Sequence, residues 1–473
     1  MAHVAWQNVE TAQLINTIPS SNTLQKQGMS TELEEVETRM EEYPMTKSFL
    51  HLIDILTEGL IPNSLGAGTR TPGFEPYLNF IRDSIFLRFN TRAYKNVVEK
   101  WEISTGCLKI MQKLLLDYTP HSSDFKRPGP QQDLTSPIGR HPGFYIMIHL
   151  LQSSEMLRMI MFILDEGCNH IDTYLKFPGK ADLEQSCLLS LQILDGALTK
   201  QGAFLEAART ANTSTLLTPL DQLLLGVNPR SGRADHMLNV TKFITYSWWL
   251  PKHTLHAVRV LSAVAESPSA QAGLLATLNT TDQIGLQIIK GFTDVLDNEE
   301  EENLDEDAVS SGRCIGAARI AIVQLLLNGL EKPAPSLSHF LLGYDIKKGV
   351  PRSNLQPPGV FGSIRTPFHA ILSFLRPAGP KQPSPTLFNA PHLCESAYKL
   401  IYHLAANHQT SEPSLRYLRS TEDFLSTQLG LLPLDGVNER LASVQVTKGI
   451  SWLLKTLAIE LKLVSAALSL IHI

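Results

Sequence analysis

Several kinds of sequence signal are missing from this chain, and each absence narrows its function. No Gly-x-Ser-x-Gly elbow, His-Glu-x-x-His helix or P-loop occurs, so no motif indicates an enzyme class. The five cysteines lie far apart in apolar stretches without any Cys-x-x-Cys pair, and we expect buried thiols of a reducing compartment. The sequence therefore favours a non-enzymatic protein, with no catalytic residues and no cofactor.

Charge is scarce as well. Only 18% of the residues are charged, and 41 Lys and Arg are outnumbered by 46 Asp and Glu, so direct binding of nucleic acid is not expected. The N-terminus lacks the basic and apolar regions of a secretory signal. Polar residues interrupt the apolar stretches at 144–164 and 450–473, which predicts buried or amphipathic helices rather than membrane spans.

What the chain does contain is apolar residues at helical spacing, most clearly between Tyr43 and Trp101. Two amphipathic helices are expected there, on either side of a Gly/Pro loop, with their apolar faces toward each other. The first predicted face consists of Met45, Phe49, Leu52, Ile53, Leu56 and Leu60, and the second of Phe74, Tyr77, Leu78, Ile81, Ile85 and Phe89.

The same pattern recurs along the chain without the alternation typical of strands. It predicts helices at about 30–42, 45–60, 75–90, 94–118, 143–166, 183–209, 235–249, 252–265, 282–297, 309–331, 393–407, 412–428 and 437–471, the last split near Gly449. Long loops are expected at about 120–142, 297–308, 343–367 and 377–391. Stacked helical pairs tolerate such loops. We therefore predict an all-α fold, one continuous α-solenoid of antiparallel helical pairs over residues 1–473, similar to HEAT or armadillo repeats.

Few residues suggest a binding site for a small ligand. The Gly-rich stretch 66–73 lacks the Lys-Ser/Thr end of a P-loop and is interpreted as an interhelical loop. His253 and His256 are three residues apart, but no further zinc ligand follows at motif spacing, and the five-residue spacing of His403 and His408 fits one helical face less well. No metal site and no small-molecule substrate are predicted.

Two segments leave alternatives open. Trp248 and Trp249 are interpreted first as core packing at a helix end and second as an exposed surface for a partner, with Trp248, Trp249 and Leu250 as candidate contacts. Residues 297–307 contain eight acids in eleven residues, which indicates a hydrated loop or a weak attachment site for basic partners. The Leu-rich runs 188–198 and 320–330 are predicted to be core.

Particular segments also suggest a family. YPMTKSFLHLIDIL (43–56) and PYLNFIRDSIFLRFNTRAYKNVVEKWEI (76–103) resemble the large scaffold nucleoporins of the nuclear pore inner ring, the nucleoporin 205 family, as do Leu194–Arg209, Phe243–Leu261 and Thr366–Leu375. Members of that family are several-fold longer, so the chain is expected to be an interior fragment or truncated product. Its tail at 465–473 matches nothing in the family, and the apolar helix from Ile450 is expected to self-associate.

The resemblance implies a scaffold component of the nuclear pore complex, located at the nuclear envelope in the nucleus. It would bind other inner-ring nucleoporins through their short linear segments and support pore assembly and nucleocytoplasmic transport. One alternative is a soluble α-solenoid transport receptor or adaptor that binds cargo or Phe-Gly repeats, and another is an enzyme with an unrecognised site. The single Phe-Gly dipeptide, Phe361-Gly362, indicates that the chain is not itself a repeat-bearing nucleoporin.

Overall fold

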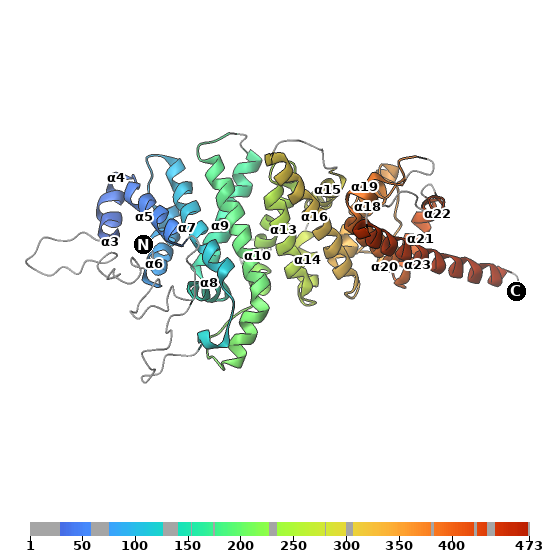
Figure 1. Ribbon diagram of the computed structural model, residues 1–473, viewed down its shortest axis with the longest axis horizontal. Coiled ribbons are helices and arrows are strands. Elements are labelled where there is room, and N and C mark those ends of the chain that lie inside the picture. The colour runs from blue at the N-terminus through green and yellow to red at the C-terminus, as the bar shows by residue number, and fades with distance from the viewer. Residues whose placement is uncertain are drawn as a thin grey trace, which may run out of the picture. The chain divides into compact units, whose positions relative to one another are not determined.

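The computed structural model describes residues 29–57, 75–125, 141–152, 154–173, 176–226, 234–279, 281–298, 306–379, 383–420, 423–432 and 440–471. Within these ranges the regular elements are helices, and no β-strand occurs, which confirms the all-α prediction. The chain divides into two compact units, Met1–Gly226 (unit 1) and Val227–Ile473 (unit 2), and each is considered by itself (Figure 1). That both belong to one continuous solenoid stays a prediction.

Unit 1 is a series of helices in which α5 packs on α7, α7 on α10, and α10 on α9. All five cysteines of the chain are free thiols, and the three in this unit are buried, as expected. The elements of unit 1 are α3 (Met29–Thr31), π-helical η1 (Glu32–Glu37), α4 (Thr38–Met40), α5 (Pro44–Thr57), α6 (Glu75–Asn79), π-helical η2 (Phe80–Ile85), 3-10 helix η3 (Phe86–Thr91), α7 (Val97–Asp117), 3-10 helix η4 (Ser122–Phe125), α8 (Pro142–Leu151), α9 (Glu155–Thr173), α10 (Lys180–Thr210) and α11 (Leu220–Leu224).

The first predicted helix exists, but its buried face differs from the prediction. Phe49 and Ile53 are buried as expected, whereas Met45 and Leu52 are 51% and 52% exposed and Leu50 is buried instead. The reason lies in α7, where a Cβ on Gly106 would come within 3.2 Å of Leu50 Cδ1. Since Gly106 has no side chain, α5 can approach α7 at Leu50, which turns Leu52 toward solvent.

The second predicted helix is divided into α6, η2 and η3, because hydrogen bonding changes along it from α to π to 3-10. Its expected face is nevertheless buried at Tyr77, Leu78, Ile81, Ile85 and Phe89. Contact with α5 includes the edge-to-face ring pair of Phe49 and Phe80, with centroids 5.6 Å apart. Leu56 is half-buried, and Leu60, Phe74 and the loop 66–73 lie outside the described residues.

Unit 2 contains two rows of neighbouring helices. α13, α16, α20 and α23 pack in succession (Figure 1). α15 packs on both η5 and α18. The elements are α12 (Asp235–Lys242), 3-10 helix η5 (Phe243–Tyr246), α13 (Pro251–Glu266), α14 (Ala270–Leu278), α15 (Asp282–Asp297), α16 (Glu306–Leu330), α17 (Leu337–Leu342), 3-10 helices η6 (Val350–Arg352) and η7 (Val360–Gly362), α18 (Pro367–Phe374), α19 (Pro385–Asn389), α20 (Pro391–Ala406), α21 (Ser411–Ser420), α22 (Phe424–Leu429) and α23 (Arg440–Ile471). Such rows are the packing of a helical solenoid.

Other predicted helices also have different limits. The stretch 143–166 contains two helices, α8 and α9, which are bent by 78° relative to each other. A new helix begins after Ser154, because its hydroxyl oxygen accepts from Met156 N–H. The stretch 412–428 is likewise split into α21 and α22. By contrast, α23 runs unbroken through Gly449, where a Cβ would lie 3.2 Å from Tyr398 Cδ2, so this glycine allows close packing and does not end the helix.

The predicted Leu-rich cores are confirmed, since most apolar side chains of 188–198 and 320–330 are buried, with Ile320 an exception at 43% exposed. Among the described helices, Gly312–Leu330 of α16 is long and apolar enough to cross a membrane, with mean hydropathy 1.3. Half of this window is buried inside the unit, as in a core helix of a packed protein. The bent pair α8 and α9 meets the same criterion only when taken together.

Candidate partner-binding surface

The predicted contact residues Trp248, Trp249 and Leu250 lie in the reversal of the chain between η5 and α13. Trp249 N–H and Leu250 N–H both donate to Tyr246 C=O, at 3.2 and 2.9 Å, which closes the turn. Pro251 then begins α13, at a position where its missing N–H leaves no hydrogen bond unmade. The expected helix 235–249 therefore ends early, as α12 followed by η5.

The structure exposes the two tryptophans. Trp248 is 83% and Trp249 55% exposed, so the first interpretation, core packing at a helix end, is wrong for both. Leu250 is only 7% exposed and is buried, so it does not contribute to the surface as predicted. The reversal explains this difference, because the chain can bury only one side of so short a turn and Leu250 occupies that side.

We call the exposed pair the tryptophan surface, and one of its members, Trp249, rests on a packed base. The Trp249 ring stacks on the buried Tyr246 ring at 5.8 Å between centroids and 17° between planes. Below it, Phe243 and His253 stack at 5.9 Å, and the Thr254 hydroxyl donates to Phe243 C=O at 3.1 Å. Aromatic side chains held in place this way lose little conformational entropy when a partner binds.

The histidines considered as metal ligands have other surroundings. His253 is buried in its stack on Phe243, and His256 is half-buried. His403 lies against the rings of Tyr402 and Trp452. Across the described residues, no group of three His, Cys, Asp or Glu side chains is placed to hold a metal ion. His253 and His403 therefore take part in aromatic packing.

The acidic segment lies largely outside the described residues, because 299–305 are among those left undescribed. At its start, Asp297 forms a bidentate ion pair with Arg365, in which Nε and Nη2 each donate at 2.6 Å. At its end, Glu306 already belongs to α16, so the predicted loop 297–308 is shorter at that side.

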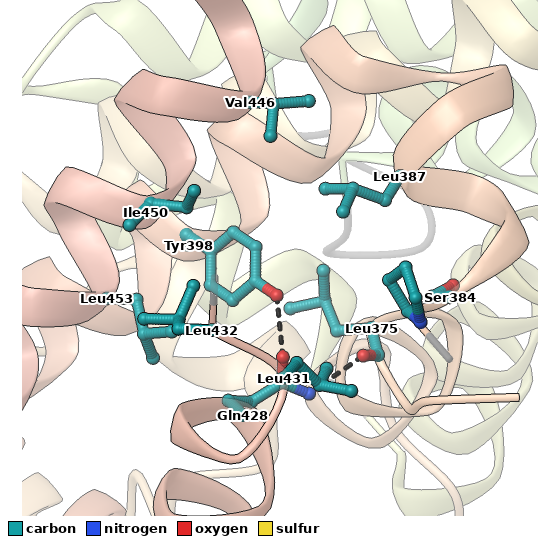
Figure 2. Close-up of a pocket in the computed structure, with 11 residues that line it drawn as sticks. Leu375, Ser384, Leu387, Tyr398, Gln428, Leu431, Leu432, Val446, Ile450 and Leu453 are labelled. Carbon is teal, nitrogen blue, oxygen red and sulfur yellow. Dashed lines mark hydrogen bonds between the residues drawn. The ribbon is translucent and has the colours of Figure 1, made fainter. Parts of the chain in front are cut away.

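A pocket in unit 2 was not predicted from the sequence (Figure 2). Its two central polar groups satisfy each other, since Tyr398 O–H donates to Gln428 Oε1 at 2.8 Å and Gln428 Nε2 donates to Leu375 C=O at 2.8 Å. Burial raises the pKa of Tyr398, so its hydroxyl stays protonated. The lining residues are Leu375, Pro383, Ser384, Leu387, Tyr398, Gln428, Leu431, Leu432, Val446, Ile450 and Leu453. The sequence did not predict this pocket because its wall combines residues from several elements that lie far apart along the chain.

Comparison with known proteins agrees with this helical architecture. The chain is 37% identical to the human nuclear pore complex protein Nup205 over 97% of its own length, and 31% identical to that of Drosophila melanogaster over 98%. The corresponding Arabidopsis thaliana protein is 27% identical over 93% of the chain. The chain spans 23%, 24% and 22% of these relatives, respectively. Residues 2–472 match the family of nuclear pore complex scaffold nucleoporins 186/192/205, and the chain therefore belongs to this family.

Proposed function

We propose that this chain is a non-enzymatic structural segment of the nuclear pore scaffold at the nuclear envelope. The observation that carries the proposal is the family match along nearly the whole chain. The helical rows support it, because stacked helices offer extended surface for other proteins. In this role the chain would bind other inner-ring nucleoporins and support pore assembly and nucleocytoplasmic transport.

The tryptophan surface is proposed as one contact with those partners. Large aromatic side chains dominate binding energy at interfaces. Trp248 and Trp249 are both exposed, and Trp249 stacks on the buried Tyr246. A short helix or an extended segment from a linker nucleoporin would bury the two rings. Such linear segments commonly bind to helical surfaces through a few apolar anchors.

The test replaces both tryptophans in the full chain, Trp248→Ala with Trp249→Ala, and measures binding of labelled linker segments from inner-ring nucleoporins. We expect at least a roughly 10-fold loss of affinity for one segment, because hot-spot truncation costs about 2 kcal/mol or more. The matched control is Leu216→Ala in unit 1, since Leu216 is 86% exposed. Circular dichroism should show unchanged helix content, and unchanged affinity for every segment would refute this contact.

Phe-Gly peptides, included in the same assay, separate a scaffold from a transport receptor. Tight binding of Phe-Gly peptides alone would contradict the scaffold role, whereas binding of linker segments would support it. Imaging of the tagged chain gives an independent readout: we expect a punctate nuclear rim, and diffuse shuttling would contradict the proposed location.

A further inference from the structure

Three buried polar side chains in unit 2 each join the end of one helix to another element. The first is Gln271 of α14. Its Nε2–H donates to Ala265 C=O in the last turn of α13 at 2.5 Å, and its Oε1 accepts from the N–H of Leu337, the first residue of α17, at 2.9 Å. The N–H groups of a first helical turn have no acceptor within their own helix. One amide group therefore connects the C-terminal end of α13 to the N-terminal end of α17.

The second joint connects the other end of α17 to α18. The hydroxyl of Thr366, the residue before α18, donates to Leu342 C=O at the end of α17 at 3.2 Å. Gly343, which follows α17 with φ +93°, lies against the same threonine, because a Cβ on it would come within 2.9 Å of Thr366 Cγ2. A glycine at this position therefore both ends α17 and leaves room for the joint.

The third joint holds the far end of α18. Gln428 of α22 donates its Nε2–H to the C=O of Leu375, the residue after α18, and its Oε1 accepts from the O–H of Tyr398 in α20, both at 2.8 Å (Figure 2). The two short helices, α17 with six residues and α18 with eight, are therefore each held at both ends by other elements. Helices of this length depend on contacts outside themselves for their stability.

We propose that Gln271, Thr366 and Gln428 form a polar spine that locks α13, α17, α18 and α20 into one cooperative body. Packed helices move by small sliding displacements against their neighbours. Such a displacement within this body would break a joint and leave a buried N–H or C=O group without a partner, which is costly. Because α17 and α18 are short and held at both ends, loosening at one joint reaches the next. Apolar packing alone would let each helix loosen separately.

Amide hydrogen exchange of the full chain tests the spine. Gln271→Met keeps the approximate size of the side chain and removes both of its hydrogen bonds. We expect exchange to become about 10-fold faster or more in α18 and α22 as well as in α17, because a lost buried partner shifts the opening equilibrium by that order. The control is Thr456→Val, since the buried Thr456 donates within its own helix, to Trp452 C=O at 3.0 Å, and it should leave α18 and α22 unchanged. Faster exchange confined to α17 and the end of α13 would overturn the proposal.

A double variant measures the coupling between the joints. When two distant sites are independent, the effects of their substitutions on the opening equilibrium multiply. Gln271→Met already releases the spine, so adding Gln428→Met should speed exchange in α18 by much less than the product of the two single effects. A full product would show that the joints act separately and would contradict the spine.

The middle joint provides a second test that does not depend on how well the glutamine variants fold. Thr366→Val removes the hydroxyl that donates to Leu342 C=O, whereas Thr366→Ser retains a hydroxyl at the same position. We expect Thr366→Val to speed exchange at the end of α13 and in α22, which lie beyond the neighbouring joints, and Thr366→Ser to behave like the original chain. Unchanged exchange in those two elements in Thr366→Val would refute the proposal.

Discussion

Two packing seams, one in each unit, are stabilised by different chemistry. In unit 1, ion pairs between side chains join α5 and α7. One oxygen of the Asp54 carboxylate accepts from Lys109 at 2.7 Å, and the other accepts from Lys113. Lys47 adds pairs to Glu99 and Glu102 at 2.6 and 3.1 Å. These groups retain partial contact with water, so their energy depends on salt.

In unit 2, α17 and α18 each have a neutral buried histidine as the third residue of the helix. His339 Nδ1 accepts from Ser336 N–H at 3.2 Å, and His369 Nδ1 accepts from Thr366 N–H at 3.0 Å. The hydroxyl oxygen of each capping residue in turn accepts from the backbone N–H of the histidine, which completes a capping box. Thr366 further donates its hydroxyl to Leu342 C=O at the end of α17, which links the two helices.

The difference teaches that helix stacks with similar apolar cores can respond differently to acid. Burial lowers the pKa of His339 to about 4, and burial also lowers the pKa of His369. For Asp54, burial alone would raise the pKa, but hydrogen bonds from Lys109 and Lys113 outweigh it and the pKa is lowered. The unit 2 seam should therefore weaken at mildly acidic pH and the unit 1 seam only at strongly acidic pH.

The substitution with the largest expected effect tests whether the two units unfold independently of each other. Phe204 is fully buried in unit 1 among Tyr118, Phe125 and Phe144, so Phe204→Ala should cost about 3–5 kcal/mol of unfolding free energy. Calorimetry should show unit 1 unfolding at lower temperature while unit 2 is unchanged. Phe361→Ala is the control, since Phe361 is 97% exposed. If the whole transition shifted together, the predicted continuous solenoid would be favoured over independent units.

The second effect is the pH dependence of unit 2. Below the ordinary histidine pKa of about 6.5, the unfolded chain takes up a proton that folded His339 does not accept until about pH 4. Stability is therefore full above about pH 6.5 and should fall by up to about 3 kcal/mol as the pH drops toward 4. Chemical denaturation across this range measures the loss.

A matched variant isolates that histidine. In His339→Gln the amide oxygen can still accept from the Ser336 N–H, as glutamine does in capping boxes, but it cannot titrate. We expect the pH dependence to decrease between pH 6.5 and 4 while stability at neutral pH changes little. An unaltered pH profile would show that His339 does not carry the effect.

The smallest effect concerns the ionic seam of unit 1. Asp54→Asn should lower stability by about 1 kcal/mol at neutral pH, because it removes the acceptor of two lysines. Since the pKa of Asp54 is lowered, its contribution is present above the ordinary aspartate pKa and is lost as the pH falls through the folded value. Glu155→Gln is the control, because Glu155 and Arg158 form an exposed pair. A difference that persisted in high salt would contradict an ionic origin.

The sequence by itself determined the helical class and most of the core. Apolar spacing is a local property, and it correctly predicted α15 at Asp282–Asp297. The burial of Ile81, Ile85, Cys107 and Cys187 was also predicted correctly. Local capping chemistry also decides where a helix begins, as Pro44 does for α5.

Only the tertiary structure decided which face each helix buries and which aromatic residues stay exposed. Leu50 replaced Leu52 because Gly106, on another helix, permits close approach there. Trp248 and Trp249 are exposed because Leu250 takes the inner side of a turn, which spacing cannot reveal. Burial is set in each case by contacts between segments distant along the chain, which a local spacing pattern does not contain.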